Sequence, residues 1–281
     1  MATNMDIQSL FGVKGKSVLV TGGAKGIGLM ISTAFVANGA RVYISSRDAK
    51  ACESAAAELN AAHSASGGKA IPLPADLSKQ SECARLADEL TKLEPNGLNV
   101  LVHNSGATWG DSYDEYPDSA WTKLLTLNLQ RVFTLTQLLT PLLEKAAQAT
   151  KSAGDENGPF PDPARIINIG SIDALRVPIL PTFAYSASKA GLHHLSRHLA
   201  THLGPRGITS NTLACGPFPS KMMAATLKRV GDEIRASSPV GRIGTPPDVG
   251  GACLFLASRA GAFINGATIA VDGGVSLVSK I

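Results

Sequence analysis

Tyr185 and Lys189 stand four positions apart, a spacing that brings two side chains to the same face of a helix. Reduction of a ketone by hydride transfer requires a proton for the developing alkoxide, and a phenol can donate it. A free tyrosine has a pKa of about 10, and a nearby ammonium group stabilises the phenolate and lowers that pKa. The pair therefore predicts an acid in reduction and a base in oxidation, tuned by Lys189. Amphipathic helices also carry such pairs, so the position in the fold decides the interpretation.

Ser171 follows an apolar segment, 166–169, and precedes the helix expected to carry Tyr185 and Lys189. In a parallel α/β sheet, ligands bind beyond the carboxyl ends of the strands, where the strand order reverses. The first, fourth and fifth predicted strands end at that point. Ser171 is therefore expected to donate a hydrogen bond to the substrate oxygen, as in an oxyanion site.

A glycine-rich turn, 21–28, directly follows the first predicted strand and opens the first predicted helix. Glycine lets the backbone approach a pyrophosphate, and the helix N-terminus offers it free N–H groups and a positive dipole end. A glycine at the end of the turn also lets the helix pack close to the sheet. The turn predicts a dinucleotide site whose cofactor-binding residues are Gly22, Lys25, Gly26, Ile27 and Gly28.

The residues after the second predicted strand indicate which nicotinamide cofactor is used. NAD enzymes of this fold usually place an acidic residue there for the ribose 2′-hydroxyl. This chain has Ser46 and Arg47, with Asp48 one position later. Arg47 can pair with a 2′-phosphate, and Lys25 can add a second positive charge. Ser46, Arg47 and Lys25 therefore predict NADP(H).

The elements that must position these residues alternate between strand and helix. Helical patterns cover 27–38, 49–62 and 81–93, and this alternation predicts a single-domain, Rossmann-like, doubly wound α/β fold with helices on both faces of a parallel sheet. Residues 148–163 are expected to form a surface insertion, and residues 1–13 a flexible N-terminal segment. The seven predicted strands are 17–20, 41–45, 70–73 (peripheral), 99–103, 166–169, 208–213 and 267–271.

These motifs occur in the order found in the classical short-chain dehydrogenase/reductase family, near its rhamnolipid-type 3-oxoacyl reductase branch. The chain resembles that family from 14 to 274, outside the insertion, including GRIGTP at 241–246 and VDGG at 271–274. The resemblance implies that Ser171, Tyr185 and Lys189 are catalytic and that Lys189 also binds the nicotinamide ribose. It adds Asn128, whose implied role is to hold a water that relays protons to Lys189.

The resemblance also implies further cofactor contacts. Tyr185 and Lys189 are among these contacts. The others include Asp76 and Leu77 after the third predicted strand, and Asn104, Ser105 and Gly106 after the fourth. After the sixth strand, Cys215 stands where the family usually has proline. The loop that follows is expected to reach the nicotinamide amide through Gly216, Pro217, Phe218 and Ser220.

The composition excludes several other classes of protein. A net charge of +4 without a basic block gives no basis for nucleic-acid binding, and no apolar stretch approaches the roughly 18 residues of a membrane span. No metal site is expected, although one predicted helix carries four histidines, because no carboxylate or cysteine stands at a matching ligand position. The histidines, interpreted as part of a structural or interface helix, are His193, His194, His198 and His202.

The substrate is predicted from the segment 218–237, an expected lid that contains Met222, Met223 and Leu227. Flexible apolar side chains favour a hydrophobic substrate. The predicted function is NADPH-dependent reduction of a hydrophobic ketone to a secondary alcohol. The ketone could be a 3-oxoacyl thioester of an acyl carrier protein or coenzyme A, an aromatic or polyketide-like ketone, or a steroid-like ketone. A non-catalytic NADP(H)-binding sensor or scaffold is the alternative from a different class.

Location and assembly carry weaker signals. The first ten residues lack the features of a signal peptide, and the four separated cysteines are interpreted as reduced thiols, so the protein is expected in the cytoplasm. Ser279, Lys280 and Ile281 differ by one residue from the peroxisomal S-K-L address, which gives an alternative location, although the tripeptide also fits a chance ending. The family resemblance alone implies a homo-oligomer, a tetramer or dimer.

Overall fold

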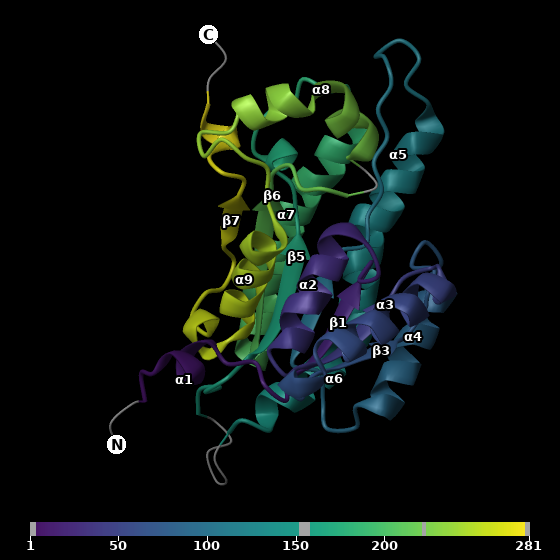
Figure 1. Ribbon diagram of the computed structural model, residues 1–281. Helices are drawn as coiled ribbons and strands as arrows, with labels where there is room; N and C mark the ends of the chain where they lie inside the picture. Colours follow the sequence, from purple (N-terminus) through teal and green to yellow (C-terminus); the bar gives the residue numbers. More distant parts are fainter. Residues whose placement is uncertain (1–3, 152–157, 221–222, 279–281) are drawn as a thin grey trace.

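The computed structural model describes residues 4–151, 158–220 and 223–278, and in them seven strands form one parallel sheet (Figure 1). The strand order is β3-β2-β1-β4-β5-β6-β7, so the order reverses between β1 and β4. The predicted fold class is confirmed. The strands are β1 (Ser17–Thr21), β2 (Arg41–Ser45), β3 (Lys69–Pro72), β4 (Val100–His103), β5 (Ala164–Ile169), β6 (Ile208–Cys215) and β7 (Thr268–Val271).

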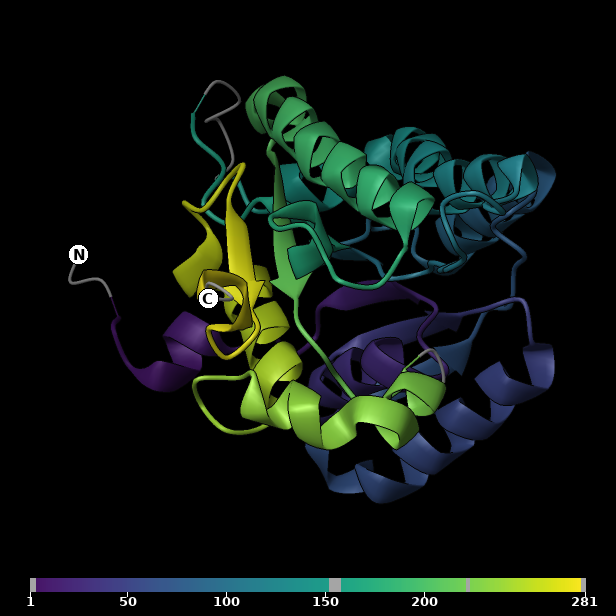
Figure 2. The ribbon, with the colours of Figure 1, turned by 90° about the horizontal axis from the view of Figure 1, so that it is seen from above.

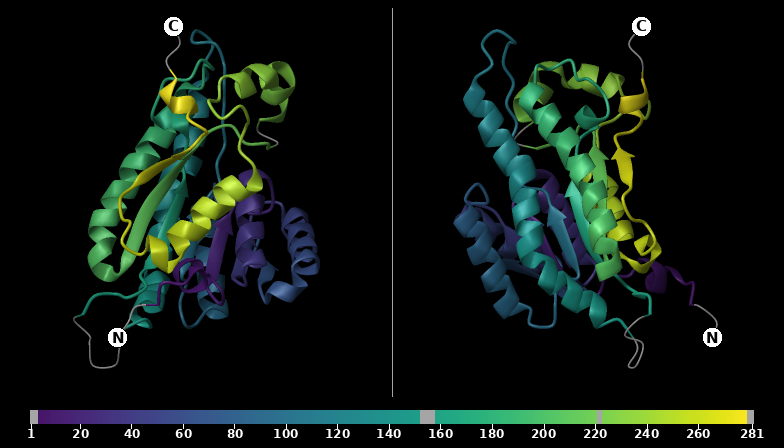
Figure 3. Two further views of the ribbon diagram at one scale, coloured as in Figure 1. Left: turned by 60° about the vertical axis from the view of Figure 1, so that its left-hand side comes forward. Right: turned by 180° about the vertical axis from the view of Figure 1, so that it is seen from behind.

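Helices cover both faces of the sheet, as Figures 2 and 3 show from above and from behind. One face carries α2 (Gly26–Ala37), α3 (Ala49–Ala62) and α9 (Pro246–Ala257), and the other carries α4 (Gln80–Leu93), α6 (Arg131–Gln148) and α7 (Phe183–Leu203). The remaining α-helices are α1 (Ile7–Phe11), α5 (Asp118–Leu125) and α8 (Ala224–Ala236), and α5 continues into a π-helical turn, Thr126–Gln130. Short 3₁₀ turns occupy Ser64–Ser66, Ile172–Ala174, Gly204–Arg206, Arg259–Gly261 and Val275–Leu277.

The central strands are apolar without alternation because both of their faces are buried. Val18 and Val20 of β1 pack into the core below α2 and α9, whereas Leu19 between them packs into the core below α4 and α6. β1 thus contributes side chains to two cores. Among the described residues, no helix is long and apolar enough to span a membrane.

The largest differences from the predicted strand boundaries are at the carboxyl end of β6 and at the amino end of β5. The sixth strand was expected to end at Leu213, but β6 continues to Cys215, which pairs with Val271 of β7. β5 begins at Ala164, two residues earlier than expected, because its N–H donates to the carbonyl of Gly207 at 2.9 Å. The peripheral position predicted for the third strand is confirmed, since β3 lies at the edge of the sheet.

The N-terminal segment expected to be flexible contains the short helix α1. Its N-cap is Asp6, whose Oδ1 accepts the Ser9 N–H at 2.9 Å. The ring of Phe11 lies 6.2 Å from the ring of Phe255 in α9. Capping and this aromatic contact place residues 6–11 beside α9, and the flexibility of the segment stays a prediction.

The expected insertion ends in a buried ion-pair cluster at the amino end of β5. Asp162 accepts hydrogen bonds from Lys16, which precedes β1, and from Arg165 in β5. Arg165 is 1% exposed and also donates to the carbonyls of Leu256 and Ser258 at 3.0 Å. The insertion therefore joins the sheet at the amino ends of the strands, away from their carboxyl ends.

Candidate active site

A cavity of about 1730 Å³ is lined by the residues that follow β1, β4 and β5 and by residues of α8. Ligand pockets usually measure about 300–1,000 Å³, so this one has room for a dinucleotide together with a second molecule. Of the residues predicted for the site, all line the cavity except Gly28 and Asn128.

Backbone angles and close contacts within the protein explain why three positions of the glycine turn are glycine. Gly22 and Gly26 have φ angles of 65° and 53°, a region that favours glycine. A Cβ on Gly28 would lie 2.1 Å from the Gly22 carbonyl oxygen and 2.4 Å from Nδ2 of Asn104. Gly28 therefore lets α2 approach the turn and the end of β4, as predicted. Lys25 precedes α2 without a side-chain cap, which leaves the helix N-terminus facing the cavity.

Thr21 and Asn104 hold this turn in place. Oγ1 of Thr21 accepts the N–H groups of Asn104 and Ser105 at 2.9 and 3.0 Å. Nδ2 of Asn104 donates to the carbonyls of Thr21 and Gly22 at 3.0 and 3.2 Å. Thr21 was missing from the predicted site, although a polar residue at the end of an apolar strand was a signal for such a role.

The two predicted cations differ in their partners. Lys25 pairs with Asp48 at 2.9 Å, and Asp48 also caps α3 by accepting the Ala51 N–H. Arg47 lines the cavity and has no ion-pair partner in the described part of the chain. The Asp48 carboxylate thus already binds Lys25 and the Ala51 N–H, and Arg47 is the cation that is available to an anionic ligand.

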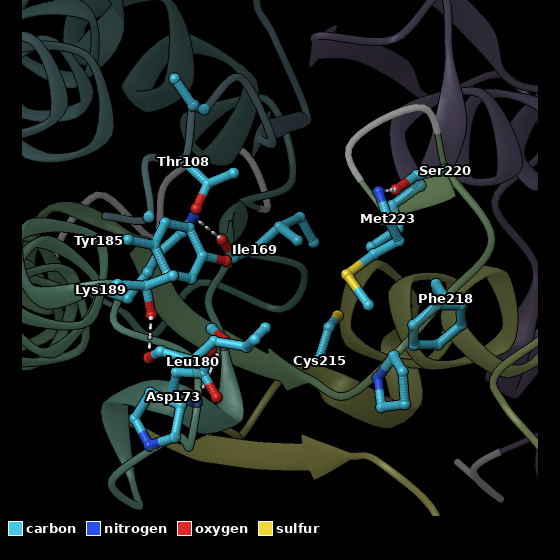
Figure 4. Close-up of a pocket in the computed structure, with 18 of the residues that line it drawn as sticks. Thr108, Ile169, Asp173, Leu180, Tyr185, Lys189, Cys215, Phe218, Ser220 and Met223 are labelled. Carbon is cyan, nitrogen blue, oxygen red and sulfur yellow. Dashed lines mark hydrogen bonds between the residues drawn. The ribbon is translucent and has the colours of Figure 1, made fainter. Parts of the chain in front are cut away.

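Tyr185 and Lys189 lie on one side of the cavity, and Met223 and Phe218 lie across from them (Figure 4). Lys189 is 6% exposed, and its Nζ donates to the Ile169 carbonyl at 2.8 Å. Nζ lies 5.8 Å from the centre of the Tyr185 ring. The helix α7 therefore brings the predicted pair to the end of β5.

Lys189 is not among the groups that shift the pKa of Tyr185 in this structure, so the tuning of Tyr185 by Lys189 stays a prediction. Burial raises the pKa of Tyr185 to about 12, and a hydrogen bond with the Ser171 side chain lowers it only in part. Burial also lowers the pKa of Lys189 to about 8, since its ammonium group faces the Ile169 carbonyl and no carboxylate. Tyr185 consequently remains protonated at neutral pH, the form that a proton donor requires.

Asn128 lies behind the cavity wall, in the π-helical turn between α5 and α6. Its Oδ1 accepts the Ala107 N–H at 2.9 Å, and its Nδ2 donates to the Ala107 carbonyl and to Oγ of Ser188. These contacts connect the loop after β4 to the residue beside Lys189. The side chain thus positions two parts of the site, and the water relay remains a prediction.

His193 is a site residue that sequence reasoning missed. It is 3% exposed and lies below Ser171, whose N–H donates to Nε2 at 3.4 Å. His194, His198 and His202 lie on the exposed side of α7 with neighbouring rings 5.1 and 6.1 Å apart. Helical spacing could have separated His193 from the other three. The described residues include no group of three His, Cys, Asp or Glu side chains suited to a metal ion.

The expected lid is only partly apolar. Met223, Val230 and Ile234 line the cavity, but so do Arg229 and Glu233, and Leu227 does not. Met222 lies outside the described residues. Phe218 is 2% exposed and packs against Gly244, which fixes the loop between β6 and α8. Cys215 is buried at the floor of the cavity, and burial raises the pKa of its thiol to about 12.

His103, at the end of β4, makes stability depend on pH. Its Nε2 lies 2.8 Å from Oγ1 of Thr136, and burial lowers its pKa to about 3. Below the unfolded-state pKa of about 6.5, the unfolded chain takes up a proton at His103 that the folded protein does not bind. The free energy of unfolding that His103 contributes is therefore fully present above that pH and is lost as the pH falls below it. The free energy of unfolding should fall between pH 7.5 and pH 5.5, and this fall should be about 1.4 kcal/mol smaller in His103→Asn than in the unsubstituted protein. Urea titration at the two pH values measures it. An unchanged loss would contradict this assignment.

Known proteins are similar to this chain over nearly its whole length. The sequence profile described as "Enoyl-(Acyl carrier protein) reductase" matches residues 22–276. A curated relative, the rhamnolipids biosynthesis 3-oxoacyl-[acyl-carrier-protein] reductase of Pseudomonas aeruginosa, is 40% identical over 95% of this chain and 98% of its own. The short-chain dehydrogenase/reductase PhomF of Diaporthe leptostromiformis is 35% identical over 94% and 92%. The solved Pseudomonas aeruginosa RhlG/NADP active-site complex matches with a TM-score of 0.85 and 39% identity, covering 95% and 99%.

The fold and the site define an oxidoreductase with a dinucleotide turn and a tyrosine–lysine pair in one cavity. The chain belongs to the short-chain dehydrogenase/reductase family. It is an enzyme acting on alcohol and carbonyl groups.

Proposed function

We propose that the protein reduces a hydrophobic ketone to a secondary alcohol with NADPH, and that the ketone is a 3-oxoacyl thioester. The observation that carries the proposal is that Ser171 and Tyr185 face the same cavity as the glycine turn and Arg47. The relative from Pseudomonas aeruginosa, named as a 3-oxoacyl-[acyl-carrier-protein] reductase, supports the thioester assignment.

The residues present fit a phosphorylated dinucleotide. Gly22 and Gly26 leave the N-terminus of α2 open to a pyrophosphate, and Arg47 with Ser46 suits a 2′-phosphate. Asp76 and Leu77 line the same end of the cavity. Further contacts are proposed for Lys25, Ile27, Asn104, Ser105, Gly106, Gly216, Pro217, Phe218, Ser220, Tyr185 and Lys189, which line the cavity as well, with Gly28 supporting the turn.

NADPH supplies the hydride when bound. Tyr185 donates the proton to the carbonyl oxygen, and its protonated state at neutral pH suits this direction. Ser171, which lines the same cavity as Tyr185, steadies the same oxygen. Lys189 would hold the nicotinamide ribose and return Tyr185 to its protonated form, while Asn128 binds both Ala107 in the loop after β4 and Ser188 beside Lys189.

Arg47 should determine the preference for NADPH over NADH. Arg47→Ala removes a charge-assisted contact to the 2′-phosphate, so the KM for NADPH should rise roughly ten- to a hundredfold while the KM for NADH changes little. Lys25→Ala should have a smaller effect, because Lys25 already pairs with Asp48. Steady-state kinetics with both cofactors measures this, and Lys50→Ala is the control, an exposed neighbouring cation outside the cavity. Equal effects on the two cofactors would contradict the assignment.

The function is tested by following NADPH oxidation with a medium-chain 3-oxoacyl thioester beside a bulky aromatic ketone. Preference for the thioester supports a place in acyl-chain metabolism, and preference for the aromatic ketone supports reduction of a specialised metabolite instead. A protein that binds NADPH but reduces neither would favour the sensor or scaffold alternative, although that alternative leaves the retained Tyr185, Lys189 and Ser171 without a purpose.

Location and assembly are proposed on narrower grounds. We propose a cytoplasmic location, which the four separated cysteines, interpreted as reduced thiols, support. Ser279, Lys280 and Ile281 lie outside the described residues, and no comparison supports a peroxisomal address. A homo-oligomer, dimer or tetramer, is expected from the family, and light scattering in solution tests it.

A further inference from the structure

Tyr185, Lys189 and His193 form one row along α7, because residues four positions apart lie on the same face of a helix. The first two line the cavity, whereas His193 does not. His193 is 3% exposed, and its Nε2 accepts the Ser171 N–H at 3.4 Å. The row therefore ends in a buried residue that touches the site through Ser171 and that the proposed mechanism does not use.

The imidazole of His193 occupies the space that a side chain at Gly170 would take. A Cβ on Gly170 would lie 2.2 Å from Nε2 of His193 and 2.7 Å from Cγ2 of Thr212. On the side of β6, the Gly170 N–H donates to the Leu213 carbonyl at 2.8 Å. The backbone between β5 and Ser171 is thus held by β6 through one hydrogen bond and by α7 through the imidazole.

His193 can accept the Ser171 N–H only as a neutral imidazole. A neutral ring has one acceptor nitrogen, whereas both nitrogens of the charged ring carry hydrogen. Burial, together with the positive charges of Lys189 and Arg197, lowers the pKa of His193 to about 4. The ring is therefore neutral at pH 7, and Nε2 stays available to Ser171.

The other ring nitrogen of His193 makes the residue unfavourable for stability. When Nε2 accepts, Nδ1 carries the hydrogen, and Nδ1 is buried without a hydrogen-bond partner in the described part of the chain. An unpaired buried donor destabilises a protein, and an apolar side chain at the same position avoids that penalty. Stability thus does not account for a polar ring at this position, whereas its contact with Ser171 does.

We infer that His193 is a positioning residue, which fixes the Ser171 backbone so that the Ser171 hydroxyl meets the substrate oxygen. This inference rests on the proposed function. Oγ of Ser171 accepts the Asp173 N–H at 3.1 Å, so the hydroxyl hydrogen remains free for the substrate. His193 and Asp173 thus hold the backbone and the side chain of Ser171 in turn. Hydrogen-bond donors stabilise a developing oxyanion best when the protein holds them in place beforehand.

The experiment combines substitutions at His193 with loss of the Ser171 hydroxyl. His193→Leu removes the acceptor, His193→Gln places an amide oxygen near the position of Nε2, and Ser171→Ala removes the donor to the substrate. The readouts are kcat and KM for reduction of a 3-oxooctanoyl N-acetylcysteamine thioester by NADPH, with NADPH binding and urea unfolding measured on the same proteins.

We expect His193→Leu to lower kcat about tenfold or more, because a misplaced donor loses much of its effect on the transition state. The KM for the thioester and the Kd for NADPH should change by less than about twofold, because His193 lies outside the cavity. His193→Gln should keep kcat within about threefold of the unsubstituted enzyme, because an acceptor remains.

The double variant tests whether His193 acts through Ser171. In the Ser171→Ala background, His193→Leu should cause no further loss of kcat, because two substitutions that remove one interaction are not additive. His194→Leu is the matched control, since His194 is the next residue of α7 and is exposed. That variant should retain the kcat of the unsubstituted enzyme.

The outcomes separate the inference from the proposed function. Independent losses from His193→Leu and Ser171→Ala would overturn the inference and leave the proposed function intact, and so would a loss that His193→Gln does not restore. A loss of activity that follows the unfolded fraction would overturn it as well, because His193 would then serve the fold alone. No turnover by the unsubstituted enzyme would overturn the proposed function and the inference together.

Discussion

Tyr185→Phe should reduce kcat for ketone reduction by about a thousandfold and affect NADPH binding far less. The substitution removes the only group proposed to donate the proton, and general acid catalysis contributes about a hundred- to ten-thousandfold. The ring, which lines the cavity, is kept. Single-turnover kinetics measures the loss, and fluorescence titration with NADPH measures binding.

Tyr43→Phe is the control for loss of a buried tyrosine hydroxyl. Tyr43 is 2% exposed, donates to Glu94 at 2.8 Å and lies outside the cavity. That variant should retain full activity at temperatures where it stays folded. If Tyr185→Phe retained turnover, the proton would have to come from another group, and the proposed mechanism would be wrong.

Asp162→Asn should lower the free energy of unfolding by about 3 kcal/mol, because it leaves two cations in the protein without their counter-charge. Arg165 is fully buried, and the side chain of Lys16 is only 13% exposed. Burial already lowers the pKa of Lys16 and Arg165, and Asp162 opposes that shift. Urea unfolding at pH 7 measures the change.

Asp232→Asn provides a control with the same chemistry. Asp232 also pairs with an arginine three positions later, Arg235, but its side chain is 96% exposed. Exposed ion pairs contribute about 0–1 kcal/mol, so this variant should lose little. Equal losses from the two substitutions would show that burial does not strengthen the Asp162 cluster.

The sequence was sufficient to predict the parts of the molecule that follow local rules. Apolar runs predict the seven strands, and the order of the strands predicts that the glycine turn lies near Tyr185 and Lys189; the structure has seven strands, and one cavity is lined by the turn and by both side chains. Contacts between distant segments could not be predicted in this way. The Lys16–Asp162 pair joins residues 146 positions apart, and the raised pKa of Tyr185 depends on burial that only the packed site creates. The contact between His193 and the Ser171 N–H depends on packing in the same way.

The pairing of β1 with β4 also determines the order in which the chain can fold. Ser17 hydrogen-bonds Asn99 across 82 positions, so the middle of the sheet closes only after a long segment has been synthesised. β1, β2 and β3 can associate earlier, because their connections are shorter. Closing long loops before their contacts form slows folding, and chains of this size usually pass through intermediates. We therefore expect the N-terminal strands to be protected from hydrogen exchange before β5, β6 and β7 join the sheet.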